Sequence, residues 1–152
     1  MSGPLVGAPA PDFSMPDTHG TPVTLASLRG APAVLVFVPF AFSGTCTGEL
    51  CELRDNLAEF ASAGVRLLGV SCDPMFSLRA WAEHEGYAFD LLSDFWPHGA
   101  ASRAYGVFDE ASGHALRGSF LVDADGVLRW SVVNPRGQAR PLAAYREALA
   151  AL

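Results

Sequence analysis

The chain of 152 residues contains no lysine, and all ten of its basic residues are arginine. A lysine general base and a Schiff-base lysine are therefore excluded. Charge is also scarce: 17% of the residues are charged and 50% are hydrophobic, which is typical of a globular protein rather than a disordered one. The formal net charge is −6, so neither nucleic acid nor an anionic membrane surface is expected as the main partner.

Long apolar runs and targeting signals are missing too. No stretch approaches the roughly 18 apolar residues of a membrane span, and residues 1–15 lack the basic start and apolar run of a signal peptide. Three cysteines are an odd number and too few for a disulfide scaffold. The length fits one domain over residues 1–152, and a reducing cytoplasm is the expected compartment.

Patterns that hold cofactors are also lacking. No GxGxxG or GxxxxGK pattern is present to cradle a phosphate, so a nucleotide cofactor is not expected. The four histidines are scattered, and the Cys-x-x-x-x-Cys spacing is not the Cys-x-x-Cys of zinc ribbons. A metal site is not expected either.

The chain does contain an ordered alternation of strand and helix patterns. Strands are expected at 21–25, 31–40, 64–73 and 88–94 and as a hairpin over 117–135, and helices over 45–63, 75–86, 97–106 and 140–152. Buried parallel strands joined by helices, with a hairpin at the edge, predict an α/β fold. We expect a mixed central sheet with helices on both faces, an arrangement that resembles the thioredoxin fold with additions.

The stretch "PFAFSGTCTGELC" places Cys46 where the apolar strand over 31–40 gives way to a helix. Helix N-termini expose unpaired N–H groups and a positive dipole end, and both favour an ionised sulfur. The alternative is that Cys46 is a small buried hydrophobic residue, as many lone cysteines are. Location alone does not separate these interpretations.

Three neighbours of Cys46 favour a reactive sulfur. Pro39 ends the strand and shields the position without offering a backbone donor. Ser43 lies three residues before Cys46, and its hydroxyl can donate to one atom while accepting from another. Glu49 lies three residues after Cys46 on the same helix face, where it could orient an arginine or simply favour the first helical turn.

The pattern Pro39-x-x-x-Ser43-x-x-Cys46 is similar to the Pro-x-x-x-Thr/Ser-x-x-Cys signature of peroxiredoxins. The segments "FSGTCTGELCELRDNL", "LLSDFWPHGAASRAYGVF" and "RGSFLVD" resemble the alkyl hydroperoxide reductase E subgroup in particular. The resemblance implies that Cys46 attacks the peroxide and that Arg117, in "ALRGSF", completes the site. It also implies a homodimer. A surface charge beside a strand is the ordinary alternative for Arg117.

Cys51 departs from the one-cysteine members of that subgroup and resembles the resolving cysteine of bacterioferritin-comigratory-type peroxiredoxins. Cα atoms five apart on an intact helix are roughly 8–9 Å apart, too far for a disulfide, so the helix would have to unwind. Cys51 could instead only pack in the core. Cys72 lies at the end of the strand expected over 64–73 and is a second candidate for the resolving role, although a structural thiol is the simpler interpretation.

Aromatic residues in and around these segments could line an apolar peroxide pocket or a dimer face. Most of them are nevertheless expected to belong to the core, and the segment "DFWPHG" has the composition of a surface turn. The residues concerned are Phe40, Phe42, Trp81, Phe95, Trp96 and Tyr105.

The combined prediction is a thiol-dependent peroxidase that reduces hydrogen peroxide, organic hydroperoxides or peroxynitrite through a sulfenic acid on Cys46. A thioredoxin-, glutaredoxin- or mycoredoxin-like protein, or a small thiol, would then restore the thiol. The alternative from another class is a non-enzymatic redox sensor in which a bond between Cys46 and Cys51 switches the helix.

Overall fold

The computed structural model describes residues 3–152, so the first two residues of the N-terminal stretch considered above lie outside it. Its central sheet has five strands in the order β5-β4-β3-β8-β9. Their bounds are β3 Ala33–Phe37, β4 Arg66–Ser71, β5 Asp90–Ser93, β8 Arg117–Val122 and β9 Leu128–Asn134. β3, β4 and β5 are parallel, whereas β8 runs antiparallel to β3 and β9 antiparallel to β8. The sheet is mixed, as predicted.

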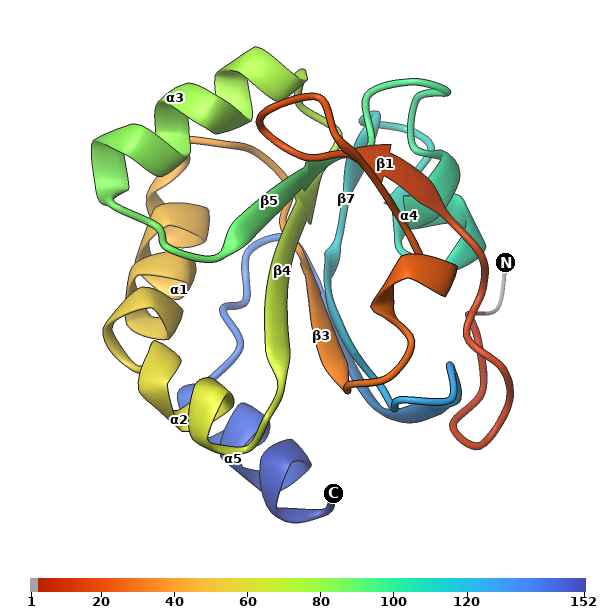
Figure 1. Cartoon of the computed structure of the whole chain (residues 1–152). Coiled ribbons are helices and arrows are strands. Elements are labelled where there is room, and N and C mark those ends of the chain that lie inside the picture. Colours follow the sequence, from red (N-terminus) through yellow and green to blue (C-terminus); the bar gives the residue numbers. More distant parts are fainter. Residues whose placement is uncertain (1–2) are drawn as a thin grey trace.

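Helices lie on both faces of this sheet (Figure 1). One face is covered by α1 (Gly44–Asp55), α2 (Leu57–Ser62), α3 (Met75–Glu85) and α5 (Leu142–Ala150), and α4 (Ala100–Ala104) lies on the other face with the N-terminal segment. The predicted α/β layering is therefore confirmed. Within residues 3–152, none of the helices combines the length and the apolar character needed to cross a bilayer.

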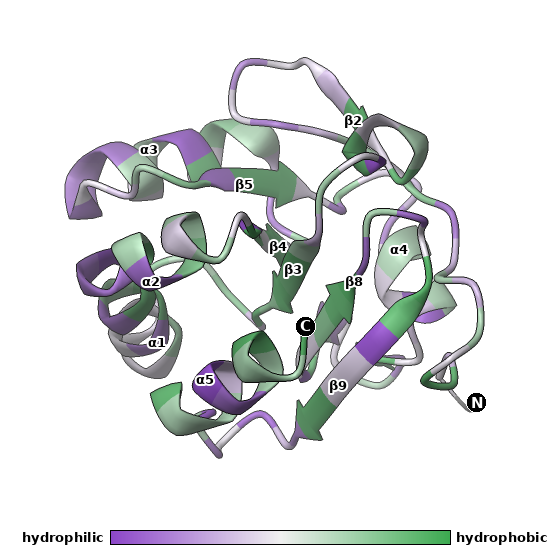
Figure 2. Cartoon of the chain, turned by 60° about the horizontal axis from the view of Figure 1, so that its bottom comes forward, coloured by the Kyte–Doolittle hydropathy of each residue, from purple (hydrophilic) through white to green (hydrophobic). Residues whose placement is uncertain are grey.

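Strand β3 shows why the sheet is buried on both sides. Its five residues are all buried, and because side chains alternate along a strand, successive residues enter different cores. Val34 and Val36 pack beneath α1 and α5, whereas Leu35 and Phe37 pack toward α4. Figure 2 shows hydrophobic strands at the centre of the molecule and helices that carry both hydrophobic and hydrophilic residues. The continuous apolar run that predicted a buried strand thus serves two cores.

Two small hairpins and a short 3-10 helix complete the chain. β1 (Ser14–Pro16) pairs with β2 (Pro22–Thr24), η1 covers Ala26–Leu28, and β6 (Phe108–Asp109) pairs with β7 (His114–Ala115). β2 matches the strand expected at 21–25, but the β6–β7 hairpin was not predicted. Strands of two residues are too short to show an alternating pattern in the sequence.

The prediction of a single helix over 45–63 is wrong in one respect: the structure has two helices here. α1 ends at Asp55 and α2 begins at Leu57. Between them Asn56 has φ −119° and ψ 20°, and its side-chain amide donates to the carbonyl of Glu52 at 2.8 Å. Asparagine competes in this way with the helical backbone. The apolar period continues across the break, which is why the sequence pattern conceals it.

Candidate active site

Helix α1 begins directly beside the strand that leads into it. Ser43 is its N-cap residue, with extended backbone angles, and the Ser43 hydroxyl oxygen accepts a hydrogen bond from the Cys46 N–H at 3.3 Å. Serine is a favoured residue for this position. Cys46 therefore lies in the first turn, where the helix dipole is positive, and its side chain is 0% exposed. The backbone N–H of Cys46 is already paired within the protein.

Arg117 reaches Cys46 from a strand 71 residues further along the chain. It is the first residue of β8, and the pairing of Ser119 with Val36 places it beside the residues that follow β3. Its Nη1 donates to the Cys46 Sγ at 3.4 Å, and its Nε donates to the carbonyl oxygen of Arg136 at 2.6 Å. The guanidinium of Arg117 is thus the charged group in direct contact with the Cys46 sulfur.

Glu49 lies between two arginines in the core of this site. Its Oε1 accepts from Arg117 Nη1 at 2.5 Å and from Arg140 Nη2 at 2.9 Å. Its Oε2 accepts from the Arg140 backbone N–H at 2.6 Å and from Arg140 Nε at 3.0 Å. Arg140 also donates to the carbonyl of Gly118 and to the hydroxyl of Ser119. The position that Glu49 holds beside Arg117 is the one expected from the sequence.

The three charged groups are buried together, with Arg117 2% and Arg140 4% exposed. Burial alone would raise the pKa of Glu49, but the hydrogen bonds and charge of Arg140, with the charge of Arg117, hold that pKa below its ordinary value. One carboxylate with two guanidiniums leaves a formal charge of +1. Because uncompensated buried charge is costly, an anion beside Arg117 is favoured, and the Cys46 sulfur occupies that place.

A hollow of about 360 Å³ opens above the site. Its lining residues are Pro39, Phe40, Ser43, Gly44, Thr45, Arg117, Arg136 and Gly137. Cys46 lies beneath this lining rather than in it. Every fully buried side-chain nitrogen or oxygen of residues 3–152 has a hydrogen-bond partner, whereas Arg117 Nη2 donates to none of these residues. Arg117 Nη2 therefore reaches the surface of the hollow with its donors free.

Cys51 lies on the same helix in very different surroundings. It is half-buried, and its Sγ donates to Glu85 Oε1 at 3.4 Å and lies 3.7 Å from the Tyr87 hydroxyl. Burial raises the pKa of the Cys51 thiol, and Glu85 raises it further against the opposing effects of Tyr87 and Arg54. All three cysteines of the chain are free, and Cys46 and Cys51 stand on an intact helix.

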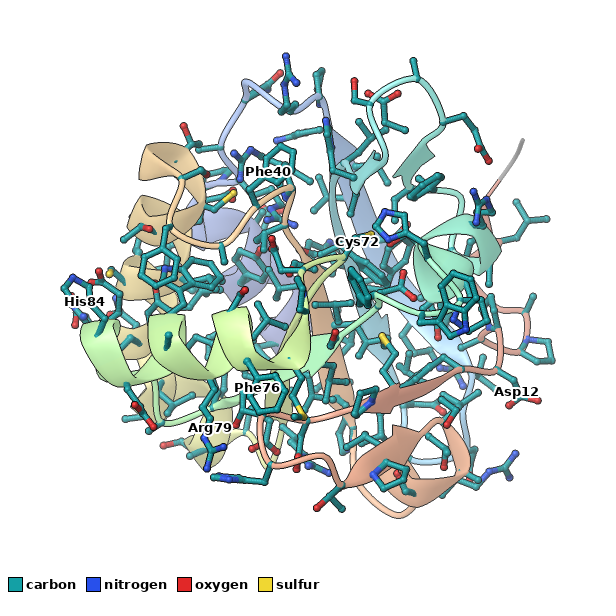
Figure 3. All side chains as sticks on the ribbon, turned by 90° about the horizontal axis from the view of Figure 1, so that it is seen from above. Asp12, Phe40, Cys72, Phe76, Arg79 and His84 are labelled. Carbon is teal, nitrogen blue, oxygen red and sulfur yellow. The ribbon has the colours of Figure 1, made fainter. Side chains whose placement is uncertain are left out.

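Cys72 follows β4 at the same sheet edge as the start of α1 but points to the opposite face. Its sulfur lies 3.7 Å from the Ser102 hydroxyl of α4 and 4.0 Å from Asp94 Oδ2. Figure 3 shows Cys72 on the α4 side, away from Phe40, which lines the hollow. Burial is the main cause that raises the pKa of Cys72 to about 11. The sheet therefore separates this thiol from Cys46.

The aromatic residues near the site fall into two groups. Trp81 and Tyr105 are buried in the core. Four others that the sequence placed around the site are exposed: Phe40, Phe42, Phe95 and Trp96. The expectation that most of these aromatics belong to the core is therefore wrong. Trp96 is 80% exposed, because the turn "DFWPHG" carries it away from the sheet.

Sequence reasoning missed Arg140 and Arg136, which both come from the loop between β9 and α5. Arg140 holds Glu49, and the Arg136 carbonyl holds Arg117. The only available signal was the position of two arginines in a short Gly- and Pro-containing segment, "NPRGQARP". That signal is weak, since loop arginines are usually exposed.

Comparison with known proteins identifies the lineage. The AhpC/TSA family profile matches residues 6–131. Alkyl hydroperoxide reductase E of Mycobacterium tuberculosis is 49% identical over 148 residues, which cover 97% of each chain. Peroxiredoxin 2 of Thermoplasma acidophilum is 35% identical over 86% of this chain and 67% of its own length.

Solved structures agree with that result. The crystal structure of Enterococcus faecalis AhpC superposes with a TM-score of 0.88 at 30% identity, covering 99% of this chain and 92% of that one. Peroxidoxin BcpB of Mycobacterium tuberculosis gives a TM-score of 0.83 at 30% identity, with 99% and 96% covered. The predicted thioredoxin-like fold is thereby confirmed. The chain belongs to the AhpC/TSA family of peroxiredoxins, in the subgroup of the alkyl hydroperoxide reductase E proteins.

Proposed function

We propose that Cys46 is the sulfur with which this thiol-dependent peroxidase attacks a peroxide, assisted by Arg117 and Ser43. The observation that supports this most directly is the charge balance of the buried group formed by Glu49, Arg117 and Arg140. Its formal charge of +1 lies against the Cys46 sulfur, and an anionic sulfur neutralises it. The nucleophile required for the reaction is thus favoured before any substrate arrives.

The reaction is a two-electron transfer from sulfur to oxygen. The Cys46 thiolate attacks the nearer oxygen of a hydroperoxide, the O–O bond breaks, and the sulfur becomes a sulfenic acid. The departing oxygen carries growing negative charge. It takes a proton and leaves as water from hydrogen peroxide or as an alcohol from an organic hydroperoxide, and it leaves within nitrite from peroxynitrite. The free donors of Arg117 Nη2 in the hollow are placed to bind this oxygen. Pro39 closes the hollow on one side.

Glu49 is a positioning residue in this proposal, because it holds the guanidinium that touches the reacting atoms. Ser43 assists indirectly: its hydroxyl oxygen accepts the hydrogen bond of the Cys46 N–H and so fixes the direction of the first turn of α1. Hydrogen peroxide, organic hydroperoxides and peroxynitrite all present the O–O bond that this arrangement cleaves.

We infer that Cys51 resolves the sulfenic acid by forming a disulfide with Cys46. Residues five apart on a helix are roughly 8–9 Å apart between Cα atoms, beyond disulfide reach, so the first turns of α1 must unwind first. A thioredoxin-, glutaredoxin- or mycoredoxin-like protein, or a small thiol, would then reduce the bond. This cycle requires a reducing compartment, for which we propose the cytoplasm.

Mass spectrometry after one equivalent of hydrogen peroxide tests both steps. We expect a bridge between Cys46 and Cys51 in the wild-type protein and a sulfenic acid on Cys46 in the Cys51→Ser variant. A stable sulfenic acid in the wild type would instead mean one-cysteine chemistry. Peroxide consumption by the Cys46→Ser variant with a thiol reductant would overturn the assignment of the nucleophile, and a wild-type protein that consumed only one equivalent would be a sensor.

We also propose that two copies of the chain associate, as the resemblance implies. Phe76, Phe95 and Trp96 are exposed around an apolar hollow of about 330 Å³, and clustered exposed apolar residues commonly mark interfaces. Figure 3 shows Phe76 on the outer side of α3. In sedimentation experiments we expect a dimer for the wild type and a monomer for Trp96→Glu. A wild-type monomer at micromolar concentration would contradict the proposal.

A further inference from the structure

The thiol of Cys51 is in hydrogen-bond contact with a carboxylate that the peroxidase reaction itself does not use. Glu85 is the last residue of α3, and its Oε1 lies 3.4 Å from the Cys51 Sγ. Figure 3 shows this end of α3, marked by His84, beside α1. The Tyr87 hydroxyl lies 3.7 Å from the same sulfur. The sulfur expected to attack a sulfenic acid is thus already paired with a proton acceptor.

Two basic residues lie against Glu85 and fix its position. Arg54 Nη1 lies 3.9 Å from Glu85 Oε1 and donates to the Glu85 backbone carbonyl at 2.6 Å. His84 Nε2 lies 3.7 Å from Glu85 Oε2. The Glu85 side chain is 21% exposed, so its contact with Cys51 is partly shielded from water. Cys51 faces one carboxylate, one phenol and one guanidinium, and of these only the carboxylate can accept its proton at neutral pH.

We propose that Glu85 is the general base of the resolving step, a role that rests on the proposed function of Cys51. As the Cys51 sulfur attacks the sulfur of the Cys46 sulfenic acid, its proton passes to Glu85 Oε1. The S–S bond forms while the S–O bond of Cys46 breaks, and the hydroxide that leaves takes a proton to become water. Cys51 loses its thiol proton, Cys46 loses its oxygen, and no outside reductant or oxidant takes part.

The contacts also indicate which sulfur moves. Cys51 is held by Glu85 and Tyr87. The turn before it is held at Glu49 by Arg117 and Arg140. It is also held at Thr47, where Trp81 Nε1 donates to Oγ1 at 3.2 Å and the Tyr87 hydroxyl donates to the carbonyl at 3.5 Å. Unwinding of the first turn as far as Thr47 breaks the bonds at Thr47 and the bond from Arg117 to Cys46, and it leaves the bonds of Glu49 and the contact of Cys51 with Glu85 in place. Cys46 then travels to a stationary Cys51 that is already next to its base.

Backbone strain lies at the end of the segment that must move. Phe42, the residue before the N-cap, has φ 67°, a left-handed conformation that is unfavourable for a bulky side chain. Unwinding of the first turn allows this residue to return to an ordinary conformation. Release of the strain at Phe42 therefore favours the unwinding that brings Cys46 toward Cys51.

The Glu85→Gln variant tests the proposal with two readouts of opposite sign. The amide keeps the size of the side chain but cannot take a proton, so we expect the conversion of sulfenic acid to disulfide, followed by acid quenching and mass spectrometry, to slow by about 10²-fold. Glu85 also raises the pKa of Cys51, so its removal should make Cys51 of the reduced protein react faster with iodoacetamide. A purely structural disturbance would not separate these two rates in this way.

The pH profile gives a further readout. With Glu85 present, the resolving rate should change little between about pH 6 and 8, because the Cys51 proton passes to the adjacent carboxylate during the attack and no free thiolate is needed. In Glu85→Gln the reaction needs free Cys51 thiolate, so its rate should rise about tenfold per pH unit below the thiol pKa. Glu85→Asp should restore part of the rate and the flatter profile.

The matched control is Glu83→Gln, which removes an exposed carboxylate of the same helix and should leave both rates unchanged. A Glu85→Gln protein that forms the disulfide at the wild-type rate with the wild-type pH profile would overturn the role of Glu85 alone. A wild-type protein that forms no bridge between Cys46 and Cys51 would overturn the resolving function of Cys51 and, with it, the base.

Discussion

Two cysteines five residues apart on one helix lie in surroundings of opposite charge. Cys46 is fully buried against a guanidinium and the positive end of α1, whereas Cys51 is half-buried against a carboxylate and a phenol. The first sulfur faces a cation, whereas burial and the carboxylate of Glu85 raise the pKa of the second. The comparison shows that the reactivity of a cysteine is determined by what the tertiary structure brings to it, since the two residues share one local sequence.

The largest effect on the surroundings of Cys46 is expected for Glu49→Gln, which leaves Arg117 and Arg140 buried with no carboxylate. We expect the free energy of unfolding to fall by about 3–5 kcal/mol, the usual effect of breaking a buried ion pair from one side. Urea unfolding measures it. Because the pKa of Glu49 is lowered by folding, its contribution is present above its ordinary value of 4.5 and is lost as the pH falls below it.

A matched control for that variant is Glu59→Gln, in which the lost carboxylate pairs with Arg146 at the surface. Exposed pairs contribute only about 0–1 kcal/mol. If Glu49→Gln destabilised the protein no more than Glu59→Gln, the buried charge group would not be the feature that distinguishes the surroundings of Cys46.

Arg117→Gln removes the guanidinium from Cys46 while leaving Cys51 untouched. We expect the second-order rate of sulfenic acid formation to fall by about a hundred- to a thousand-fold, as for the loss of one donor to a developing oxyanion. Stopped-flow kinetics with hydrogen peroxide measures this. The rate of the subsequent disulfide formation should change far less. A loss below threefold in the first rate would mean that Arg117 does not contact the reacting atoms.

The third cysteine, Cys72, extends the comparison of thiol surroundings to a buried thiol with a raised pKa. The pKa of Cys72 is raised to about 11 from a reference of 9.0, so its thiolate fraction near neutral pH is about a hundredfold below that of a reference thiol. Native-state labelling with iodoacetamide, resolved by mass spectrometry, should show Cys72 modified far more slowly than Cys51. The difference should vanish in guanidinium. Equal rates in the folded protein would contradict the burial of Cys72 behind α4.

The smallest effect is expected for Cys72→Ser. The serine hydroxyl can occupy the place of the sulfur beside Ser102 and Asp94, and the sheet separates that place from Cys46. Steady-state peroxidase activity with a thiol reductant should stay within about twofold of the wild type, as expected for a change away from the reacting groups. If Cys72→Ser formed no disulfide with Cys46 after oxidation, Cys72 rather than Cys51 would have the resolving role.

Sequence reasoning reached β3 and β4 because each lies in a continuous apolar run, and β8 and β9 because the Asp-Gly pair in "DADG" marks a hairpin turn. It did not foresee the break at Asn56, where the apolar period runs on although the backbone does not. Nor did it foresee the β6–β7 hairpin, which is too short for a pattern. Local patterns predict elements that bury many residues and pass over those that depend on one or two contacts.

The site shows the same division. Pro39, Ser43 and Cys46 form one local motif, and the structure places Ser43 at the N-cap and Pro39 in the wall of the hollow. Arg117 could be assigned only through the family resemblance, and Arg140 was not found at all. Long-range partners of a buried charge leave no trace in the sequence near that charge.

The bonds between Glu49 and Arg140 join residues 91 positions apart, and Arg117 depends on the carbonyl of Arg136. A polypeptide emerging from the ribosome therefore presents Cys46 long before the residues that surround it in the folded protein have been made. Until residues 136–140 have been made and packed against α1, the nascent chain carries an ordinary cysteine. In the role proposed for Cys46, its charged surroundings are complete only after synthesis has passed residue 140.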